Sequence, residues 1–489
     1  MVEKRDVIVV GGGPVGLWIS CELRLAGLSV VVLERRNERI NQSRALTIHG
    51  RSVEMFSLRG LEERFIRTGI PIPTGHYAVL DTRLGFDFID SKFPYTLFLP
   101  QDATEAILEQ RALELGVEVV RGATVDKVDI EEDAVSVHAE GKDGPLAYTG
   151  SYVIGADGTR SLVRQSAGIA FEGHPASGMW FMGDVVLGDP PKVPVLSEFN
   201  MAGCAMVAPL GDGRHWRIVL NEAEDRGKTR ADPVTLEELK TATRNILGSD
   251  LGARDPLWLS RFDNETRLAA HYRKGRAFLA GDAAHIHLPA GGQGMNVGLQ
   301  DAMNLGWKLA MVMKGEAPET LLDSYEQERR PIGLYLHDTT MAQAALITAF
   351  SPHGLALRGV MNDMLKVPAI NQYFALQVSG FGVHYPLPLP GDVMEPAGGL
   401  TGTRIRDVEL HLENGVKTTL FSLLSDGRWL SLSLDAVSRA SVPSWVPAHA
   451  IVTATGRPAE PMPTLERLAA ITLRPDGYVA GFVERRTLR

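Results

Sequence analysis

The first 34 residues constrain the fold more than any other part of the chain, because they combine a strand, a glycine-rich turn, a helix and a second strand. Val7–Val10 is an apolar, β-branched run typical of a strand buried in a parallel sheet. The sequence Gly11-Gly-Gly-Pro-Val-Gly16 follows directly and matches G-x-G-x-x-G, which permits a tight turn and brings backbone amides close to a pyrophosphate. We expect a helix over residues 17–26 and a second strand over residues 29–33. The pattern predicts a doubly wound α/β domain that binds a dinucleotide.

Glu34 lies at the end of the second predicted strand, 18 residues after Gly16. A carboxylate near this spacing accepts hydrogen bonds from the adenine ribose and repels a 2′-phosphate, so the site favours FAD or NAD over NADP. Arg35 and Arg36 come next and either stack on the adenine or face solvent. From this segment we predict that the following residues bind the cofactor: Gly11, Gly13, Pro14, Val15, Gly16, Glu34 and Arg35.

Length and composition narrow the class of protein. A chain of 489 residues exceeds what one core usually serves, so we expect two or three domains. The net charge of −9 and the lack of a long basic run argue against a nucleic-acid partner. No apolar stretch is long enough for a membrane span, and the two cysteines, Cys21 and Cys204, show no metal or redox spacing. These features predict a cytoplasmic protein without a membrane partner or a bound metal.

Two later motifs resemble those of a known family. Gly155-Ala-Asp-Gly-Thr-Arg160 ends one apolar run, and a longer motif occupies residues 276–296 and includes Gly281-Asp-Ala-Ala-His285. With the N-terminal motif they resemble, in order and spacing, the FAD fingerprints of class A flavoprotein monooxygenases. More narrowly, the chain resembles the aromatic-polyketide hydroxylases and the rifamycin-type monooxygenases.

The resemblance implies a fold in three parts. We expect an α/β protein with a discontinuous Rossmann-like FAD domain of the glutathione-reductase type, an inserted antiparallel β-sheet substrate domain, and a C-terminal thioredoxin-like domain. The last part contains the turn Arg474-Pro-Asp-Gly477 but no Cys-x-x-Cys, so we expect it to be structural. The predicted boundaries are 1–75, 99–175 and 266–385 for the FAD domain with its connecting helices, 76–98 and 176–265 for the substrate domain, 386–402 for a linker, and 403–489 for the C-terminal domain.

The same motifs suggest how a flavin is held. Asp282 follows a predicted buried strand, where its carboxylate can accept hydrogen bonds from ribityl hydroxyls. Gly291, Gly292 and Gly294 open a predicted helix, whose positive N-terminus suits the negative charge of a reduced flavin. The resemblance further implies cofactor contacts by Arg44, Gln101, Val125, Asp157, Asp282, Pro289, Gly292, Gly294, Met295 and Asn296, with Arg160 near the cofactor or a nicotinamide. It implies that Arg44, Pro289 and Gly292 take part in catalysis.

The function implied by the resemblance is a monooxygenase that uses FAD, NAD(P)H and dioxygen, with NADPH the expected donor. It hydroxylates a polycyclic phenol or quinone through a flavin C4a-hydroperoxide. Six residues are candidates for an apolar wall around the substrate, although an aromatic side chain at strand spacing is more often part of the core: Tyr95, Phe98, Trp180, Phe181, Met206 and Trp216. The sequence identifies no base for the substrate; His215 and Tyr95 are candidates that suit packing or surface positions equally well.

Several alternatives stay open at this stage. The same chemistry suits inactivation of an antibiotic of the rifamycin or tetracycline type, a Baeyer–Villiger oxygenation, or a flavin protein that does not oxygenate. His285 and His287 alternate along the chain, but we expect no metal there because no third ligand cluster accompanies them. The sequence leaves the substrate, the oxidised position and the choice between a monomer and a homodimer undetermined.

Overall fold

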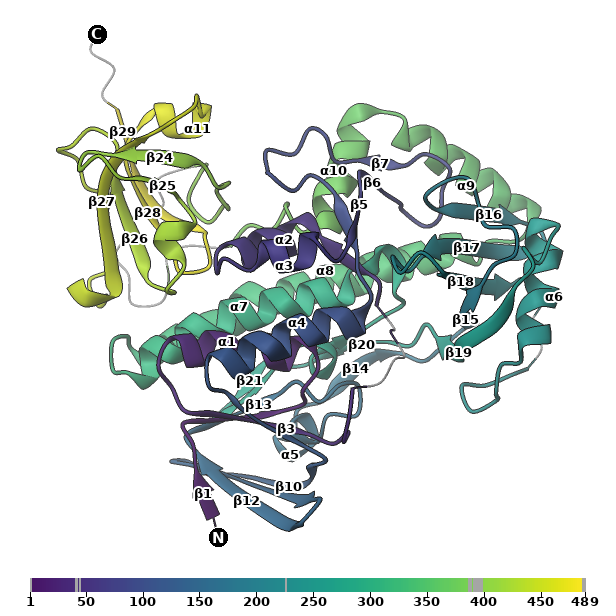
Figure 1. The fold of residues 1–489 in the computed structure, drawn as a ribbon, viewed down its shortest axis with the longest axis horizontal. Helices are drawn as coiled ribbons and strands as arrows, with labels where there is room; N and C mark the ends of the chain where they lie inside the picture. Colours follow the sequence, from purple (N-terminus) through teal and green to yellow (C-terminus); the bar gives the residue numbers. More distant parts are fainter. Residues whose placement is uncertain are drawn as a thin grey trace.

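The computed structural model describes residues 2–39, 43, 45–224, 227–385, 389 and 399–485, and it has the mixed α/β fold expected from the sequence. Two long central helices separate three regions (Figure 1). A parallel sheet lies on one side of these helices, and an antiparallel sheet and a C-terminal sheet lie at opposite ends of the molecule.

The N-terminal strand predicted from the glycine motif is the centre of a six-stranded sheet. Its strands run parallel except for one antiparallel edge strand, and their order is β21 (Arg273–Lys274), β22 (Ala277–Leu279), β13 (Tyr152–Gly155), β2 (Val7–Val10), β3 (Val30–Glu34) and β9 (Glu118–Arg121). The strands β2 and β3 are buried along their whole length, which explains their almost unbroken run of β-branched residues. Their carboxyl ends place Gly11 and Glu34 side by side at one edge of the sheet.

Helices cover the parallel sheet on the side of the glycine turn. Helix α1 (Pro14–Leu25) packs against α4 (Gln101–Glu114) and α7 (Gly294–Met313). The other face meets a sheet of four strands in the order β1 (Val2–Lys4), β12 (Gly144–Gly150), β11 (Val135–Gly141) and β10 (Thr124–Ile130). Strand β12 ends at Gly150, and Tyr152 begins β13 and pairs with Val7 in the parallel sheet, so neighbouring residues of the chain belong to different sheets.

The inserted region forms a five-stranded antiparallel sheet. Its order is β16 (Leu196–Asn200), β17 (Gly203–Pro209), β18 (His215–Glu222), β15 (Met179–Val186) and β19 (Arg254–Asp263), and α6 (Leu236–Leu247) packs on it. Short sheets connect this region to the rest: β4 (Thr47–His49), β8 (Thr96–Phe98) and β5 (Ile70–Ile72); β6 (Thr74–Gly75) and β7 (Leu84–Gly85); and β14 (Phe171–His174), β20 (Thr266–Ala269) and β23 (His285–Ile286).

Two helices follow each other closely along the chain. They are α9 (Pro352–Leu365) and α10 (Pro368–Ser379), and only Lys366 and Val367 lie between them. Pro368 has no amide hydrogen and lies in the first turn of α10, where an amide hydrogen would have no partner within the helix. The remaining helices are α2 (Gly50–Ser57), α3 (Glu62–Ile66), α5 (Leu162–Ser166), α8 (Asp323–Ile347), which contains Pro331, and α11 (Pro463–Glu466).

The C-terminal region forms its own six-stranded sheet, but its core is continuous with that of the first domain. The strands lie in the order β25 (Lys417–Thr419), β24 (Glu409–Leu412), β27 (Ile451–Pro458), β26 (Trp429–Ser433), β28 (Leu468–Leu473) and β29 (Val479–Glu484). Strand β24 was not foreseen from the sequence. Buried Arg474 donates to Glu328 of α8 at 2.7 Å, and Trp307 of α7 donates to Asp476 at 3.0 Å. The sheet is therefore joined to the helices that border the FAD-type motifs.

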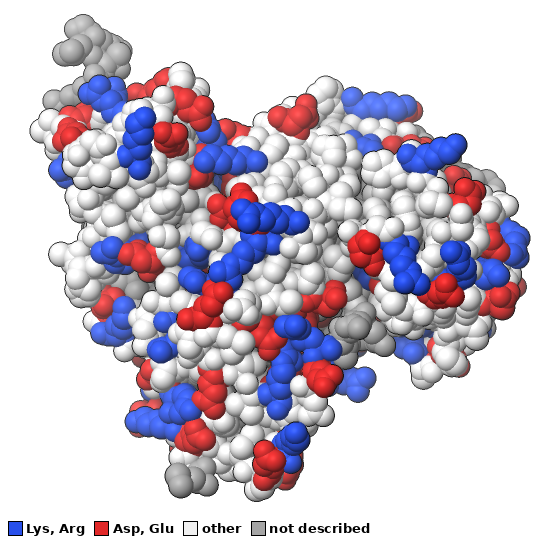
Figure 2. All heavy atoms as spheres, viewed as in Figure 1, with Lys and Arg blue, Asp and Glu red and all other residues white. Residues whose placement is uncertain are grey.

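The surface carries both signs of charge. Acidic and basic side chains are interspersed over the face seen in Figure 2. Within the described ranges, no helix is both long enough and apolar enough to cross a bilayer.

Candidate active site

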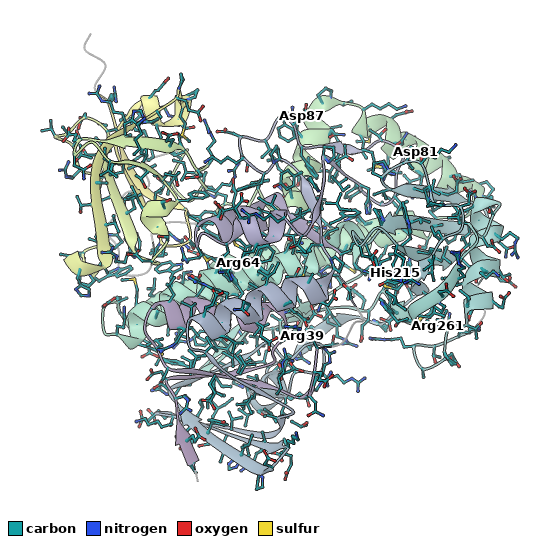
Figure 3. All side chains as sticks on the ribbon, in the orientation of Figure 1. Arg39, Arg64, Asp81, Asp87, His215 and Arg261 are labelled. Atoms are coloured by element: carbon teal, nitrogen blue, oxygen red, sulfur yellow. The ribbon has the colours of Figure 1, made fainter. Side chains whose placement is uncertain are left out.

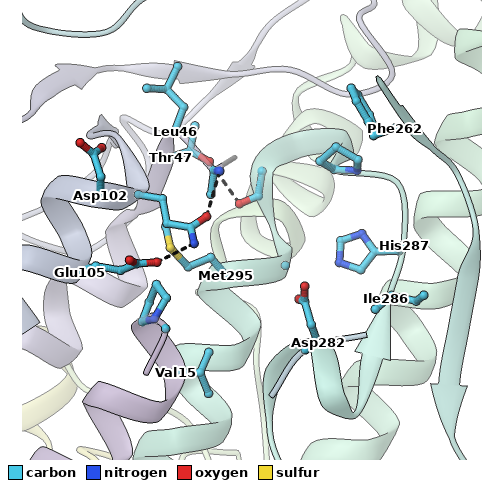
Figure 4. Close-up of a pocket in the computed structure, with 18 of the residues that line it drawn as sticks. Val15, Leu46, Thr47, Asp102, Glu105, Phe262, Asp282, Ile286, His287 and Met295 are labelled. Atoms are coloured by element: carbon cyan, nitrogen blue, oxygen red, sulfur yellow. Dashed lines mark hydrogen bonds between the residues drawn. The ribbon is translucent and has the colours of Figure 1, made fainter. Parts of the chain in front are cut away.

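One cavity of about 1010 Å³ contacts most of the residues singled out from the sequence (Figure 4). Its lining begins at the glycine turn and the ends of β2 and β3, passes η1 (Gly281–Ala283) and the N-terminus of α7, and continues onto the five-stranded sheet. We call the first part the nucleotide end and the last part the substrate end. Predicted cofactor residues that line the cavity are Gly11, Gly13, Pro14, Val15, Glu34, Arg35, Gln101, Val125, Asp157, Asp282, Pro289, Gly292, Gly294 and Met295.

At the nucleotide end, the backbone of the glycine turn packs tightly against neighbouring backbone segments. Gly11 has φ +108°, and a Cβ at this position would lie 2.2 Å from the carbonyl oxygen of Ala156. Gly13 lines the cavity, and a Cβ at this position, in contrast, would meet no protein atom within 4 Å. Gly16 does not line the cavity; a Cβ there would lie 1.9 Å from the Gly11 carbonyl oxygen, so its role is close packing of helix and turn.

Glu34 is fixed by the turn that it faces. One carboxylate oxygen accepts a hydrogen bond from the amide of Gly12 at 2.7 Å, and the other accepts one from the amide of Arg36 at 3.0 Å. The carboxylate is buried but borders the cavity, and each oxygen retains a second lone pair. This geometry agrees with acceptance of a ribose hydroxyl.

The middle of the cavity contains the second motif. Asp282, Pro289 and Met295 line it, and the short helix η2 (Ala290–Gly292) leads into α7 (Figure 4). Gly292 has φ +65°, and a Cβ there would lie 1.9 Å from Oγ1 of Thr47, which donates to the Gly292 carbonyl at 3.2 Å. The segment that precedes α7 can therefore approach a ligand with bare backbone.

Asn296 has a different role from the one predicted. Its Oδ1 accepts hydrogen bonds from the His49 amide at 2.8 Å and from Ser52 Oγ at 2.7 Å. Its Nδ2 donates to the carbonyls of Thr47 and Gly292 at 2.9 and 2.8 Å. The amide is fully used within the protein and does not line the cavity, so we revise its predicted contact with the flavin edge to one that positions the Gly292 segment.

The residues implied only by the resemblance have mixed outcomes. Gln101 lines the cavity while its amide accepts from the Ala45 amide at 3.2 Å and donates to Glu105 at 2.8 Å. Asp157 accepts from the Leu162 amide at 2.7 Å and caps α5; burial raises the pKa of its carboxyl. Arg160 lines the cavity with an exposed side chain. Arg44 lies outside the described residues.

The predicted aromatic wall is only partly at the substrate end. Phe98 and Met206 line the cavity, whereas Trp180, Phe181, Trp216 and Tyr95 do not. Trp180 and Phe181 are buried in hydrophobic cores, and Trp216 and Tyr95 pack against such cores. His215 pairs with exposed Asp212 at 2.5 Å and also stays outside the lining, which argues against it as a substrate base (Figure 3).

Polar residues that the sequence analysis missed replace them. His76, Arg83, Arg217 and Trp258 line the substrate end, and His49 lines the cavity between the two ends, beside Gly291. Burial lowers the pKa of His49 to about 4, and its ring contacts Thr96 Oγ1 at 3.1 Å and the Gly291 carbonyl at 2.8 Å. These residues come from separate elements and form no local motif, so no sequence signal grouped them.

Arg217 and Trp258 share a buried carboxylate. Arg217 Nε and Trp258 Nε1 donate to Asp184 at 2.8 and 2.7 Å, and Arg217 also donates to the Ser43 carbonyl. Asp184 lies on β15, the neighbour of both β18 and β19. This ion pair connects the five-stranded sheet to the segment at Ser43.

The side chains of His285 and His287 have different surroundings. His287 lines the cavity, and burial lowers its pKa to about 4. His285 is buried and contacts Asp301 at 2.8 Å, which also accepts from Arg329 at 2.8 Å and from the Gly281 amide at 3.2 Å. His285 therefore supports the turn that presents Asp282.

The cavity fits a flavin dinucleotide by its donor set. The glycine turn at Gly13, with its open space, and the N-terminus of α7 suit anionic groups, and Glu34 and Asp282 suit hydroxyls. Fold and site thus define a dinucleotide-binding α/β oxidoreductase with a second sheet over its reaction centre.

Comparisons with known proteins define the family. Residues 4–340 match the FAD binding domain family, and residues 398–487 match the family described as aromatic-ring hydroxylase, C-terminal. The chain belongs to this family of FAD-binding aromatic-ring hydroxylases.

Individual relatives cover nearly the whole chain. An uncharacterized aromatic compound monooxygenase, YhjG, of Bacillus subtilis is 44% identical over 99% of this chain and 95% of its own. A rifampicin monooxygenase of Streptomyces venezuelae is 38% identical over 97% of this chain and 94% of its own. The structure of OxyS anhydrotetracycline hydroxylase from Streptomyces rimosus superposes with a TM-score of 0.87 at 37% identity, covering 98% of this chain and 96% of that one.

These findings confirm three expectations from the sequence: the resemblance to class A flavoprotein monooxygenases, the class of enzyme, and FAD as the cofactor. The chain is an FAD-dependent monooxygenase that takes its electrons from NAD(P)H.

Proposed function

We propose that the enzyme hydroxylates a small polycyclic aromatic compound with phenol or quinone oxygens. The observation that carries this proposal is the continuity of the cavity, which extends from the dinucleotide motifs to a wall formed by Phe98, Met206 and Trp258. The names of the relatives support it, because OxyS is an anhydrotetracycline hydroxylase and the Streptomyces venezuelae relative is a rifampicin monooxygenase.

Different residues along the cavity bind different parts of FAD in this proposal. Bound FAD supplies the redox chemistry and the activation of dioxygen. In our proposal Glu34 accepts from the ribose, Asp282 accepts from the ribityl chain, and the Gly13 amide and Val125 face the pyrophosphate and adenine. The backbone of Gly292, Gly294 and Met295 contacts the flavin ring in this proposal, and Pro289 lies beside the ring. Asp157, with Arg160, serves the cofactor or the nicotinamide.

The helix terminus at Gly294 has an electrostatic role in this proposal. The N-terminal end of an α-helix carries partial positive charge, which stabilises negative charge that develops on a reduced ring. The substrate end excludes water and holds the aromatic ring in line with the reacting edge of the cofactor. No described side chain is assigned as the base of the reaction.

The finer fold assignments are also proposals. The strand order of the first sheet and its glycine turn support a Rossmann-like domain of the glutathione-reductase type. We propose that residues 403–489 form a thioredoxin-like domain, as the family resemblance implies. Its role is structural in this proposal, because the cysteines of the chain, Cys21 and Cys204, both lie outside it. We further propose NADPH as the donor, a cytoplasmic location, and a monomer or homodimer as the working state.

Product analysis tests the function directly. Purified protein is mixed with NADPH and a panel of polycyclic phenols, quinones and rifamycins, while NADPH loss and product mass are followed together. We expect one panel class to stimulate NADPH oxidation and to yield a product heavier by one oxygen that is stable in base. A product that hydrolyses in base indicates insertion into a ring, and a panel without any oxygenated product rejects the proposal.

One alternative has its own support. The likeness to a rifampicin monooxygenase favours a role in antibiotic inactivation. The same panel separates the two, because rifamycins that are oxygenated faster than simple polycyclic phenols identify the alternative.

A further inference from the structure

The loop of residues 76–83, between β6 and β7, contributes two polar side chains to the substrate end. His76 and Arg83 both line the cavity, at the two ends of this loop. Neither belongs to the FAD motifs, and neither was singled out by the sequence. The loop is built in a way that fixes both positions.

The centre of the loop has an unfavourable backbone conformation. Ala78 has φ 50° and Val79 has φ 53°, and both side chains are buried. Positive φ is rare for residues other than glycine, and for a β-branched residue it is an outlier. Such conformations persist only where the surroundings enforce them, and they cluster at ligand sites.

Polar side chains from three helices, of which those of Arg358 and Gln343 are buried, enforce this conformation. Arg358 of α9 donates to the carbonyls of Ala78 at 3.0 Å and of Val79 at 2.7 Å. Gln343 of α8 accepts from the Ala78 amide at 3.1 Å. Asn371 of α10 donates to the carbonyl of Arg83 at 2.9 Å. The backbone of the loop is therefore held at its middle and at its end.

His76 presents a polar atom that the protein does not satisfy. Its Nδ1 is buried and has no hydrogen-bond partner among the described residues. Burial lowers the pKa of His76 to about 4, and Arg83 and His49 lower it further. The ring is therefore neutral near pH 7. A buried polar atom without a partner is costly unless a ligand or water supplies one.

Arg83 differs from the other arginines at this end of the cavity. Arg217 pairs with Asp184, Arg261 pairs with Glu238, and Arg230 pairs with Asp263, all within 4 Å. In the part of the chain that the structure describes, Arg83 has no such ion pair and donates to Ser197 Oγ at 2.6 Å. Partial burial lowers its pKa, whereas exposed Asp81 raises it. A guanidinium has further donors than the one that Ser197 uses.

We propose that His76 and Arg83 form an anion-recognition subsite for an ionised oxygen conjugated with the aromatic ring of the substrate. The guanidinium neutralises the oxygen and the neutral imidazole hydrogen-bonds to it, so a phenol, enol or aromatic acid binds as its anion. An aromatic compound that lacks such an oxygen leaves a desolvated cation unpaired and is rejected. The subsite rests on the proposed function, because it specifies which aromatic substrates the cavity accepts.

Binding of a coloured phenol tests the subsite without turnover. Alizarin and its dimethyl ether are titrated into the FAD-loaded enzyme without NADPH, at a pH about one unit below the pKa of alizarin in the same buffer. We expect bound alizarin to show the spectrum of its anion. Arg83→Met should weaken alizarin binding ~10-fold or more, with the ether changed less than ~2-fold, while Arg83→Lys retains the anion spectrum.

Arg254→Met is the matched control, because Arg254 lies on β19 of the five-stranded sheet, is exposed and does not line the cavity. It should leave both ligands unaffected. Equal weakening of alizarin and its ether by Arg83→Met, or a bound ligand with the neutral spectrum, overturns the subsite. Arg83-dependent anion binding in an enzyme that never oxygenates any substrate supports the subsite and rejects the proposed function instead.

Discussion

The two ends of the cavity maintain their shapes by different means. At the nucleotide end, hydrogen bonds within one β-α-β unit suffice: the Gly11 amide donates to the Leu33 carbonyl, and Glu34 accepts from the Gly12 amide. At the substrate end, long-range polar contacts between separate elements hold the side chains, as in Asp184 with Arg217 and Arg358 with Val79. A ligand common to a whole family can be bound by a local motif, whereas a variable ligand is bound by a surface that many elements share.

The largest effect should come from the buried ion pair of the substrate end. Asp184→Asn leaves Arg217 without its carboxylate partner in a site where both side chains are buried. Breaking such a pair costs about 3–5 kcal/mol, so we expect the free energy of unfolding to fall by that amount. Urea denaturation of the FAD-loaded protein measures it. An unchanged midpoint would show that the pair is dispensable and that the two ends do not differ as described.

Glu34→Ala tests the nucleotide end. Loss of a hydrogen bond from a charged carboxylate to the ribose should weaken FAD binding by about 1.5–3 kcal/mol. Fluorescence titration of the apoprotein with FAD measures the affinity, and binding of alizarin to the FAD-saturated variant serves as the control for the other end. FAD affinity equal to that of the wild type would mean that Glu34 serves only the turn.

His49 connects the two ends and predicts a pH dependence. Burial lowers its pKa in the folded state to about 4, below the ordinary value of 6.5, so the unfolded chain binds the proton first as the pH falls. Stability is therefore complete above pH 6.5 and decreases as the pH falls toward 4, by about 2 kcal/mol between pH 7 and pH 5.

The His49→Gln variant provides the comparison for that prediction. Its unfolding free energy should change less between the two pH values than that of the wild type. Equal pH dependence in the two proteins would assign the effect to other groups.

The smallest effect on the folded protein is expected from Gly13→Ala. A Cβ there meets no protein atom within 4 Å, so the stability of the apoprotein should change by less than about 0.5 kcal/mol. FAD affinity should nevertheless decrease, because the methyl group points into the space reserved for the pyrophosphate. Gly11→Ala, whose Cβ meets the Ala156 carbonyl at 2.2 Å, should instead destabilise the apoprotein itself. Identical behaviour of the two variants would contradict this assignment of the two glycines.

The sequence predicted the nucleotide end well because its contacts are local. The strand Val7–Val10, the glycine turn and Glu34 follow each other within one β-α-β unit, and Asp282 and Met295 belong to one continuous motif. Asn296 was misjudged because its amide faces Thr47 and His49, which are remote in sequence.

The substrate end could not be predicted in the same way. Aromatic residues on strands alternate between two faces, and the pattern does not say which face borders the cavity. The sequence therefore left Trp180 and Trp216 as candidates for either the substrate wall or the core, and the structure places both away from the cavity, while His76, Arg83 and Trp258 were missed. Their positions depend on packing between β19, the loop of residues 76–83 and α8 to α10, which only the tertiary structure shows.

A crystal structure of the enzyme with FAD and alizarin tests the central claim, that one cavity holds the cofactor at its motif end and the aromatic substrate at its sheet end. We predict the adenine beside Glu34 and Val125, the flavin ring between Pro289 and Met295, and alizarin between that ring and Trp258 with an oxygen at Arg83. A flavin ring at the substrate end, or alizarin bound outside the cavity, would contradict the account.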